Sequence, residues 1–132
     1  MAYQAAILGL SKIGASIGLA LRRYPQELLV VGYDQDRSIT KTAERMGAVS
    51  KGFRSANRCV RESKLIILAL PLDDVHDALT IIAKEAPQDA VVIDTSPNKT
   101  QVAAWAQEIL AAGQYFTGWT LALNPETLHD PE

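Results

Sequence analysis

Two glycines and an acidic residue near the N-terminus have the spacing of a site for a pyrophosphate and a ribose. Gly9 ends an apolar run, Gly14 follows five residues later, and Asp34 lies 20 residues beyond Gly14. A glycine at the first place permits a sharp turn out of a strand, and one at the last lets the next helix lie close to the sheet. The free N–H groups and the positive dipole at the start of that helix suit a pyrophosphate, and the acid suits ribose hydroxyls. The pattern indicates a dinucleotide-binding βαβ unit.

The fingerprint of such a unit has another glycine between these two, and Ser11 occupies its place. The Cβ atom of a serine would crowd a pyrophosphate that normally meets bare backbone, yet the hydroxyl could donate a hydrogen bond to a phosphate oxygen. We therefore expect weakened cofactor binding rather than none. The other expected contacts in the turn are Leu10, Lys12 and Ile13, and Lys12 could either reach over the diphosphate or stand in solvent.

The residues after the second strand bear on the choice between NAD and NADP. A carboxylate at Asp34 repels a 2′-phosphate, which favours NAD. Arg37 leaves NADP as an alternative cofactor, because an arginine beside this position could pair with that phosphate. NAD is the expected cofactor and NADP the less favoured one.

Later residues supply the remaining candidate contacts. Leu70, Pro71 and Val75 could form an apolar wall against the nicotinamide and its ribose, although their types also suffice to end a strand and start a helix.

A polar group, Asp94, Ser96 and Lys99, follows the apolar run at 90–93. Ser96 and Lys99 are weak catalytic candidates. Ser96 is as well explained as a helix N-cap with Pro97 at the first helical position, and a lysine in a first turn is usually solvated.

Strand and helix patterns alternate along the chain, which implies a parallel sheet with helices on both faces. The predicted strands are residues 5–10, 28–34, 48–54, 64–70, 90–95 and 115–120. A connection at 55–63 is expected to hold one or two helical turns. The other four helices should bury one stripe each, namely Ile13, Ile17, Ala20, Leu21 and Tyr24; Ile39, Ala43 and Met46; Val75, Leu79, Ile82, Ala83 and Ala86; and Val102, Ala106, Ile109 and Leu110. The fold class is α/β, a three-layer, Rossmann-type, doubly wound and mainly parallel six-stranded sheet with strand order 3-2-1-4-5-6.

Composition narrows the class of protein. The chain has 132 residues, 48% apolar and 21% charged, and a formal charge of −2, which fits one globular domain and gives no reason to expect nucleic acid. No apolar run approaches the roughly 18–20 residues that cross a bilayer, and the first strand begins at once, so we expect a cytoplasmic protein. Cys59 is alone and is expected to be a buried structural thiol. His76 and His129 have no partner acid at informative spacing, and no cluster of cysteine and histidine suggests a metal.

The order of these motifs resembles the nucleotide-binding domain of prephenate dehydrogenases, and more broadly the superfamily of 6-phosphogluconate and 3-hydroxyisobutyrate dehydrogenases. The segments that carry the resemblance are residues 7–21, 31–36, 68–75 and 91–99, with Gly47 between them. The resemblance implies that residues 1–120 form a dinucleotide-binding domain and that 121–132 are a tail leading to a helical second domain. In that family the second domain provides dimerisation and much of the site for a small carboxylic-acid substrate.

Three departures from the family concern catalysis. Ser11 replaces a glycine, Pro97 stands where the family has a serine, and residues 118–121 read Gly-Trp-Thr-Leu where the family has Gly-His-Pro with a basic histidine. The resemblance therefore predicts an NAD(P)-binding domain of an oxidoreductase that is not catalytically competent alone. The alternatives are a non-catalytic NAD-sensing or protein-interaction module, and a degenerate domain in which Ser11 blocks the nucleotide.

Overall fold

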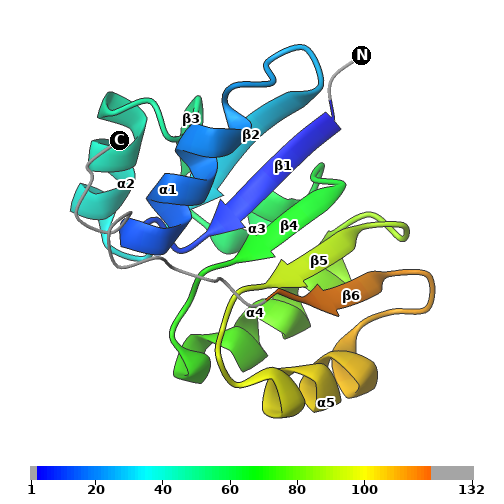
Figure 1. Cartoon of the computed structure of the whole chain (residues 1–132). Helices are drawn as coiled ribbons and strands as arrows, with labels where there is room; N and C mark the ends of the chain where they lie inside the picture. Colours follow the sequence, from blue (N-terminus) through cyan, green and yellow to red (C-terminus); the bar gives the residue numbers. More distant parts are fainter. Residues whose placement is uncertain (1–2, 120–132) are drawn as a thin grey trace.

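The computed structural model of the chain describes residues 3–119, which contain one six-stranded sheet of strand order β3-β2-β1-β4-β5-β6 (Figure 1). Every pairing in the sheet is parallel. The strands are β1 (Tyr3–Leu8), β2 (Leu28–Tyr33), β3 (Lys51–Phe53), β4 (Leu65–Leu68), β5 (Val91–Asp94) and β6 (Tyr115–Gly118). The doubly wound fold and the strand order predicted from the sequence are confirmed.

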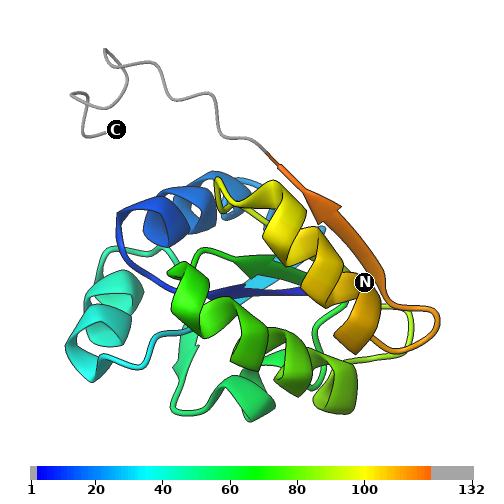
Figure 2. The same cartoon turned by 90° about the horizontal axis from the view of Figure 1, so that it is seen from below.

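Helices cover both faces of this sheet. They are α1 (Lys12–Leu21), α2 (Arg37–Arg45), α3 (Ala56–Val60), α4 (Leu72–Glu85) and α5 (Lys99–Ile109). One core cluster joins the sheet to α1 and α2, and the other joins it to α3, α4 and α5. Helices α4 and α5 pack against each other along their length (Figure 2).

Neighbouring residues of β1 belong to different cores. Ile7 packs with Val30 and Ile67 on the side of α1 and α2, whereas Leu8 packs with residues of α4 on the opposite side. Strands buried on both faces read as continuous apolar runs, because neither set of side chains meets water. This explains why the sequence of β1, β2 and β4 shows no alternation of polar and apolar residues.

Helix α1 buries only part of the predicted stripe, since Ile17 and Leu21 pack against the core while Ala20 is exposed. Its buried residues are Gly14, Ala15 and Gly18, while Ile13 is 40% exposed and Tyr24, beyond the helix, is 56% exposed. Small residues also bring this helix close to its neighbours, and a Cβ atom at Gly18 would lie 2.3 Å from the carbonyl oxygen of Ala48. Apolar periodicity does not reveal the contacts at Gly14 and Gly18, because these contacts are made by backbone.

Helix α2 is capped by Asp36 and buries a polar residue. The Asp36 side chain accepts a hydrogen bond from the Ser38 N–H, and Gly47 ends the helix with a φ of +83°. Thr40 is fully buried, and Met46, predicted to face the core, is 51% exposed. The Thr40 hydroxyl donates to the carbonyl oxygen of Asp34 at 3.2 Å, so its polar group is satisfied in the core.

Gly18→Ala tests the close contact of α1 with the sheet. Alanine is the better residue in a helix interior by about 1 kcal/mol, but the added Cβ would meet the Ala48 backbone. We expect overpacking to dominate and the free energy of unfolding to fall by roughly 1–3 kcal/mol, measured by urea denaturation. Ser16→Ala, on the exposed side of the same helix, is the control and should change it by less than about 0.5 kcal/mol. An unchanged or higher stability of Gly18→Ala would contradict the packing described here.

Candidate functional site

The turn between β1 and α1 requires glycine at its first place. Gly9 has a φ of +96°, and a Cβ atom there would lie 2.3 Å from the carbonyl oxygen of Ala69. The conformation and the space both exclude a side chain. A Cβ atom at Gly14 would lie 1.8 Å from the carbonyl oxygen of Gly9 itself. The turn and the first helix are therefore in backbone contact, as the spacing of the two glycines predicts.

The N-terminus of α1 presents backbone N–H donors. Ser11 is the N-cap residue, its side chain makes no capping hydrogen bond, and the first turn of the helix holds no acid. The Ala15 N–H donates to the Ser11 carbonyl and begins the helical ladder, so the N–H groups of Lys12, Ile13 and Gly14 precede it. Such an end attracts an anion through its free N–H groups and its dipole.

Asp34 connects the end of β2 to this turn. Its Oδ2 accepts a hydrogen bond from the Leu10 N–H at 2.9 Å, and its Oδ1 accepts one from the Asp36 N–H at 2.9 Å. A carboxylate has about four lone-pair sites, so two remain for other donors such as hydroxyls. Asp34 was predicted from the sequence to accept hydrogen bonds from ribose hydroxyls, but not to hold the turn in position.

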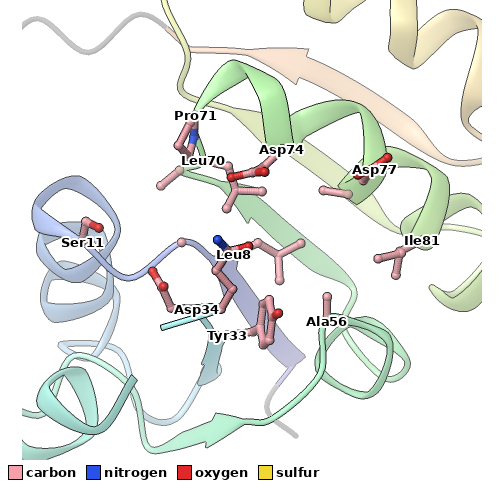
Figure 3. A pocket seen from close by; sticks show the side chains of 14 residues that line it. Leu8, Ser11, Tyr33, Asp34, Ala56, Leu70, Pro71, Asp74, Asp77 and Ile81 are labelled. Carbon is pink, nitrogen blue, oxygen red and sulfur yellow. The ribbon is translucent and has the colours of Figure 1, made fainter. Parts of the chain in front are cut away.

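A cavity of about 270 Å³ opens beside the turn (Figure 3). Four segments enclose it: the turn after β1, the end of β2, the start of α3, and α4 with the loop before it. The residues that line it are Leu8, Gly9, Ser11, Tyr33, Asp34, Gln35, Ala56, Ala69, Leu70, Pro71, Asp74, Asp77, Ala78 and Ile81. Leu70 and Pro71 thus border the cavity, whereas Val75 is fully buried in the core beneath it.

The cavity carries an excess of negative charge. Asp34, Asp74 and Asp77 line it, and no lysine or arginine is among the lining residues. Arg37 lies exposed in the first turn of α2, outside this lining. Asp74 is a lining residue that was not identified from the sequence. The spacing Asp74, Ala78 and Ile81, one face of a helix, was the available signal.

The polar group after β5 is arranged differently from its prediction. Ser96 is not the N-cap of α5, because its Oγ accepts a hydrogen bond from the Asn98 N–H at 2.9 Å and closes a turn two residues ahead of it. Asn98 is the N-cap, and the helix begins at Lys99. The Lys99 Nζ donates to the backbone carbonyl oxygens of Asp94, at 3.4 Å, and of Trp119. Lys99 therefore joins the ends of β5 and β6.

Asp94 is a fully buried acid without a direct partner. Neither of its carboxyl oxygens accepts a hydrogen bond from the part of the chain that the structure describes. Burial raises the pKa of this carboxyl, and the Ser96 backbone and the charge of Lys99 offset part of that effect. The arrangement favours a neutral Asp94 over a wider range of pH than an exposed aspartate has.

Comparison with known proteins identifies the family of the chain. Residues 17–120 match the family described as "Prephenate dehydrogenase, nucleotide-binding domain". The chain belongs to this family. The matched region includes Asp34, Leu70, Pro71 and Lys99, and it begins after the Gly9–Gly14 turn.

The curated relatives are prephenate dehydrogenase-type enzymes that are longer than this chain. A cyclohexadienyl dehydrogenase of Zymomonas mobilis subsp. mobilis is 26% identical over 105 residues, and a prephenate dehydrogenase of Bacillus subtilis is 25% identical over 113 residues. The matches cover 80% and 85% of this chain but 36% and 30% of the relatives. The chain therefore spans about a third of the length of these relatives.

Solved structures share the fold. Prephenate dehydrogenase from Aquifex aeolicus has a TM-score of 0.81 at 23% identity, over 92% of this chain and 44% of that one. A structure of the A. aeolicus enzyme in complex with hydroxyphenyl propionate and NAD⁺ has a TM-score of 0.78 at 22% identity, over 88% and 40%. Members of the prephenate dehydrogenase nucleotide-binding family and this chain thus have the same doubly wound sheet.

Three further observations concern residues 3–119. Their helices are all too short or too polar to cross a membrane. Within the same residues, His, Cys, Asp and Glu side chains form no group of three or more that could hold a metal ion. Cys59 is fully buried, and burial raises the pKa of its thiol to about 12, which makes it unreactive.

Replacing Asp94 by asparagine should change how stability depends on pH. The pKa of Asp94 is raised in the folded chain, so its ionisation destabilises the fold as the pH rises above its ordinary value of 3.8. Asparagine has the same shape and does not ionise. The free energy of unfolding of Asp94→Asn, relative to the wild type, should therefore increase as the pH is raised through the folded pKa toward neutrality, measured by urea denaturation at a series of pH values.

Asp89→Asn is the control with the opposite sign. The hydrogen bond from Lys64 lowers the pKa of Asp89, so the wild type should gain stability over this variant as the pH rises toward 3.8 and above. If the wild type instead gains stability relative to Asp94→Asn over the same range of pH, Asp94 is stabilised as a carboxylate and the expectation is contradicted.

Proposed function

We propose that this chain binds NAD at the Gly9–Gly14 turn, as the nucleotide-binding domain of a prephenate dehydrogenase-like oxidoreductase. The observation that carries the proposal is the N-terminus of α1, which has no acid in its first turn and no side-chain cap within the described residues. It is held against the sheet beside Asp34, whose carboxylate keeps acceptor capacity. In this arrangement the N–H groups of the turn would hold the diphosphate, and Asp34 would accept hydrogen bonds from the adenosine ribose. Leu70 and Pro71 supply apolar surface beside the path toward the nicotinamide.

The bound cofactor would supply hydride chemistry, and the residues of this chain would bind and orient it. Ser96 and Lys99 are poorly placed as bases. Ser96 is 8% exposed and its hydroxyl oxygen already accepts a hydrogen bond from the Asn98 N–H, and the Lys99 Nζ donates to two backbone carbonyls. Thr120, which stands where the family has its histidine, lies outside the described residues.

We therefore also propose that this chain alone does not oxidise a substrate. A hydroxyl must meet a base within about 3 Å and a pocket that orients it. The small carboxylic-acid substrate, a helical second domain after residue 120 and a homodimer remain part of this proposal, and they rest on the greater length of the relatives. A cytoplasmic location is also part of this proposal, and it rests on the single cysteine, which is buried.

The alternative is a non-catalytic module that senses NAD or binds a protein partner. Ser11 and Pro97, which replace a glycine and a serine of the family pattern, favour it. Steady NADH production from prephenate by the purified chain would exclude it, and NAD binding without turnover is compatible with both. The third possibility, a degenerate domain, predicts neither heat nor thermal shift with millimolar NAD.

Titration calorimetry with NAD and NADP tests the proposed cofactor. The wild type should bind NAD more tightly, because a 2′-phosphate would meet Asp34 in a cavity without a lysine or arginine. Asp34→Ala should weaken NAD binding and narrow the difference between the two cofactors. Thermal unfolding of Asp34→Ala must be measured beside its titration, because Asp34 also accepts a hydrogen bond from the Leu10 N–H and its loss could destabilise the fold.

Asp73→Ala is the matched control for this change. It removes the same charge from an exposed site on α4 that does not line the cavity, and should leave both affinities unaltered. Tighter binding of NADP by the wild type would show that the role given to Asp34 is wrong.

Ser11→Gly should strengthen NAD binding about fivefold, a gain on the order of 1 kcal/mol. Ser11 has a φ of −70°, so glycine relieves no backbone strain, and its side chain makes no capping hydrogen bond that would be lost. The expected gain comes only from space for the pyrophosphate. Ser16→Ala, further along the exposed face of the helix, should leave the affinity unchanged. Weaker binding by Ser11→Gly would mean that the hydroxyl contacts a phosphate.

A further inference from the structure

Asp74 is a polar side chain of the cavity that has no role when the diphosphate and ribose are assigned. Asp74 is half-buried, lies in the first turn of α4 and lines the cavity. Figure 3 shows Asp34 and Asp74 on opposite walls, one from the end of β2 and the other from α4. If Asp34 holds the adenosine ribose, as the proposed function requires, Asp74 faces the space available to the base.

The surroundings of Asp74 suit a flat apolar ring. Tyr33, Ala56, Leu70, Ala78 and Ile81 line the same cavity, and all are apolar or aromatic. Small-molecule sites commonly combine such a lining with a few polar groups that fix the orientation of the ligand. A purine base fits this chemistry, with a carboxylate as the orienting group.

The carboxylate also determines which purine is favoured. An ionised carboxyl group only accepts hydrogen bonds, and the positive end of the α4 dipole favours its negative charge. Adenine carries acceptor nitrogens in its ring and one donor, the 6-amino group. Hypoxanthine has a carbonyl oxygen in place of that amino group, and a carboxylate facing it would oppose one acceptor to another.

We propose that Asp74 selects the adenine base, its carboxylate accepting a hydrogen bond from the 6-amino group. Asp77 also lines the cavity but is exposed, so it is less able to discriminate between bases. The inference rests on dinucleotide binding in this cavity and adds the residue that specifies the base.

The test is calorimetric titration of the full chain with NAD and with nicotinamide hypoxanthine dinucleotide, its 6-oxo analogue. The wild type should bind NAD about tenfold more tightly, the effect of one charge-assisted hydrogen bond at a half-buried site. Asp74→Ala should lose most of this preference by weakening NAD binding while leaving the affinity for the analogue unchanged or higher. Asp74→Asn should also bind the two about equally, because an amide can accept from the amino group or donate to the oxo group.

Asp73→Asn is the control, since it makes the same change of charge at the neighbouring exposed position and should keep the preference for NAD. Thermal unfolding checks that each variant folds. Equal binding of the two dinucleotides by the wild type, or an undiminished preference in Asp74→Ala, would overturn the role of Asp74 while the proposed function stands. Failure of the wild type to bind either dinucleotide would overturn both.

Discussion

The backbone contact between the first helix and the first turn determines the geometry of the candidate site. A Cβ atom at Gly14 would lie 1.8 Å from the Gly9 carbonyl oxygen, and one at Gly18 would lie 2.3 Å from that of Ala48. Helix α1 therefore meets its neighbours with bare backbone at two levels, and its N-terminus is fixed at the end of β1. A larger side chain at Gly14 would lift the helix and move its free N–H groups away from Asp34.

The order of the strands and a few hydrogen bonds bring the other walls to the same place. Because β1 lies between β2 and β4, the carboxyl ends of these three parallel strands meet at one edge. The Gly9 N–H donates to the Tyr33 carbonyl, the Ala69 N–H donates to the Leu8 carbonyl, and Asp34 accepts from Leu10. The result is a site with unlike halves: positive helix dipole on one side, and carboxylates around an apolar slot on the other. That asymmetry matches a ligand with a diphosphate joined to an uncharged nucleoside.

The sequence predicts the parts of this structure that depend on local patterns. Continuous apolar runs and turn residues determine the strands, and Asp36 shows the start of α2. Prediction from the sequence fails where tertiary contacts override periodicity. Ile13 faces out because backbone occupies the buried side of α1, and Thr40 is buried because the Asp34 carbonyl satisfies its hydroxyl. Ser96 closes a turn instead of capping a helix, a choice between two local hydrogen bonds that residue type does not resolve.

The central claim is that the dinucleotide binds at the turn held by Gly9 and Gly14. Titration of the ¹⁵N-labelled chain with NAD, followed through backbone amide chemical shifts, tests it most directly because it reports location as well as affinity. The largest changes should fall on the amides of residues 9–14 and around Asp34, with little change near Leu19 and Met46, at the part of the groove between α1 and α2 that lies beyond the turn. Changes centred on that groove or on another face, or no change at millimolar NAD, would contradict the account.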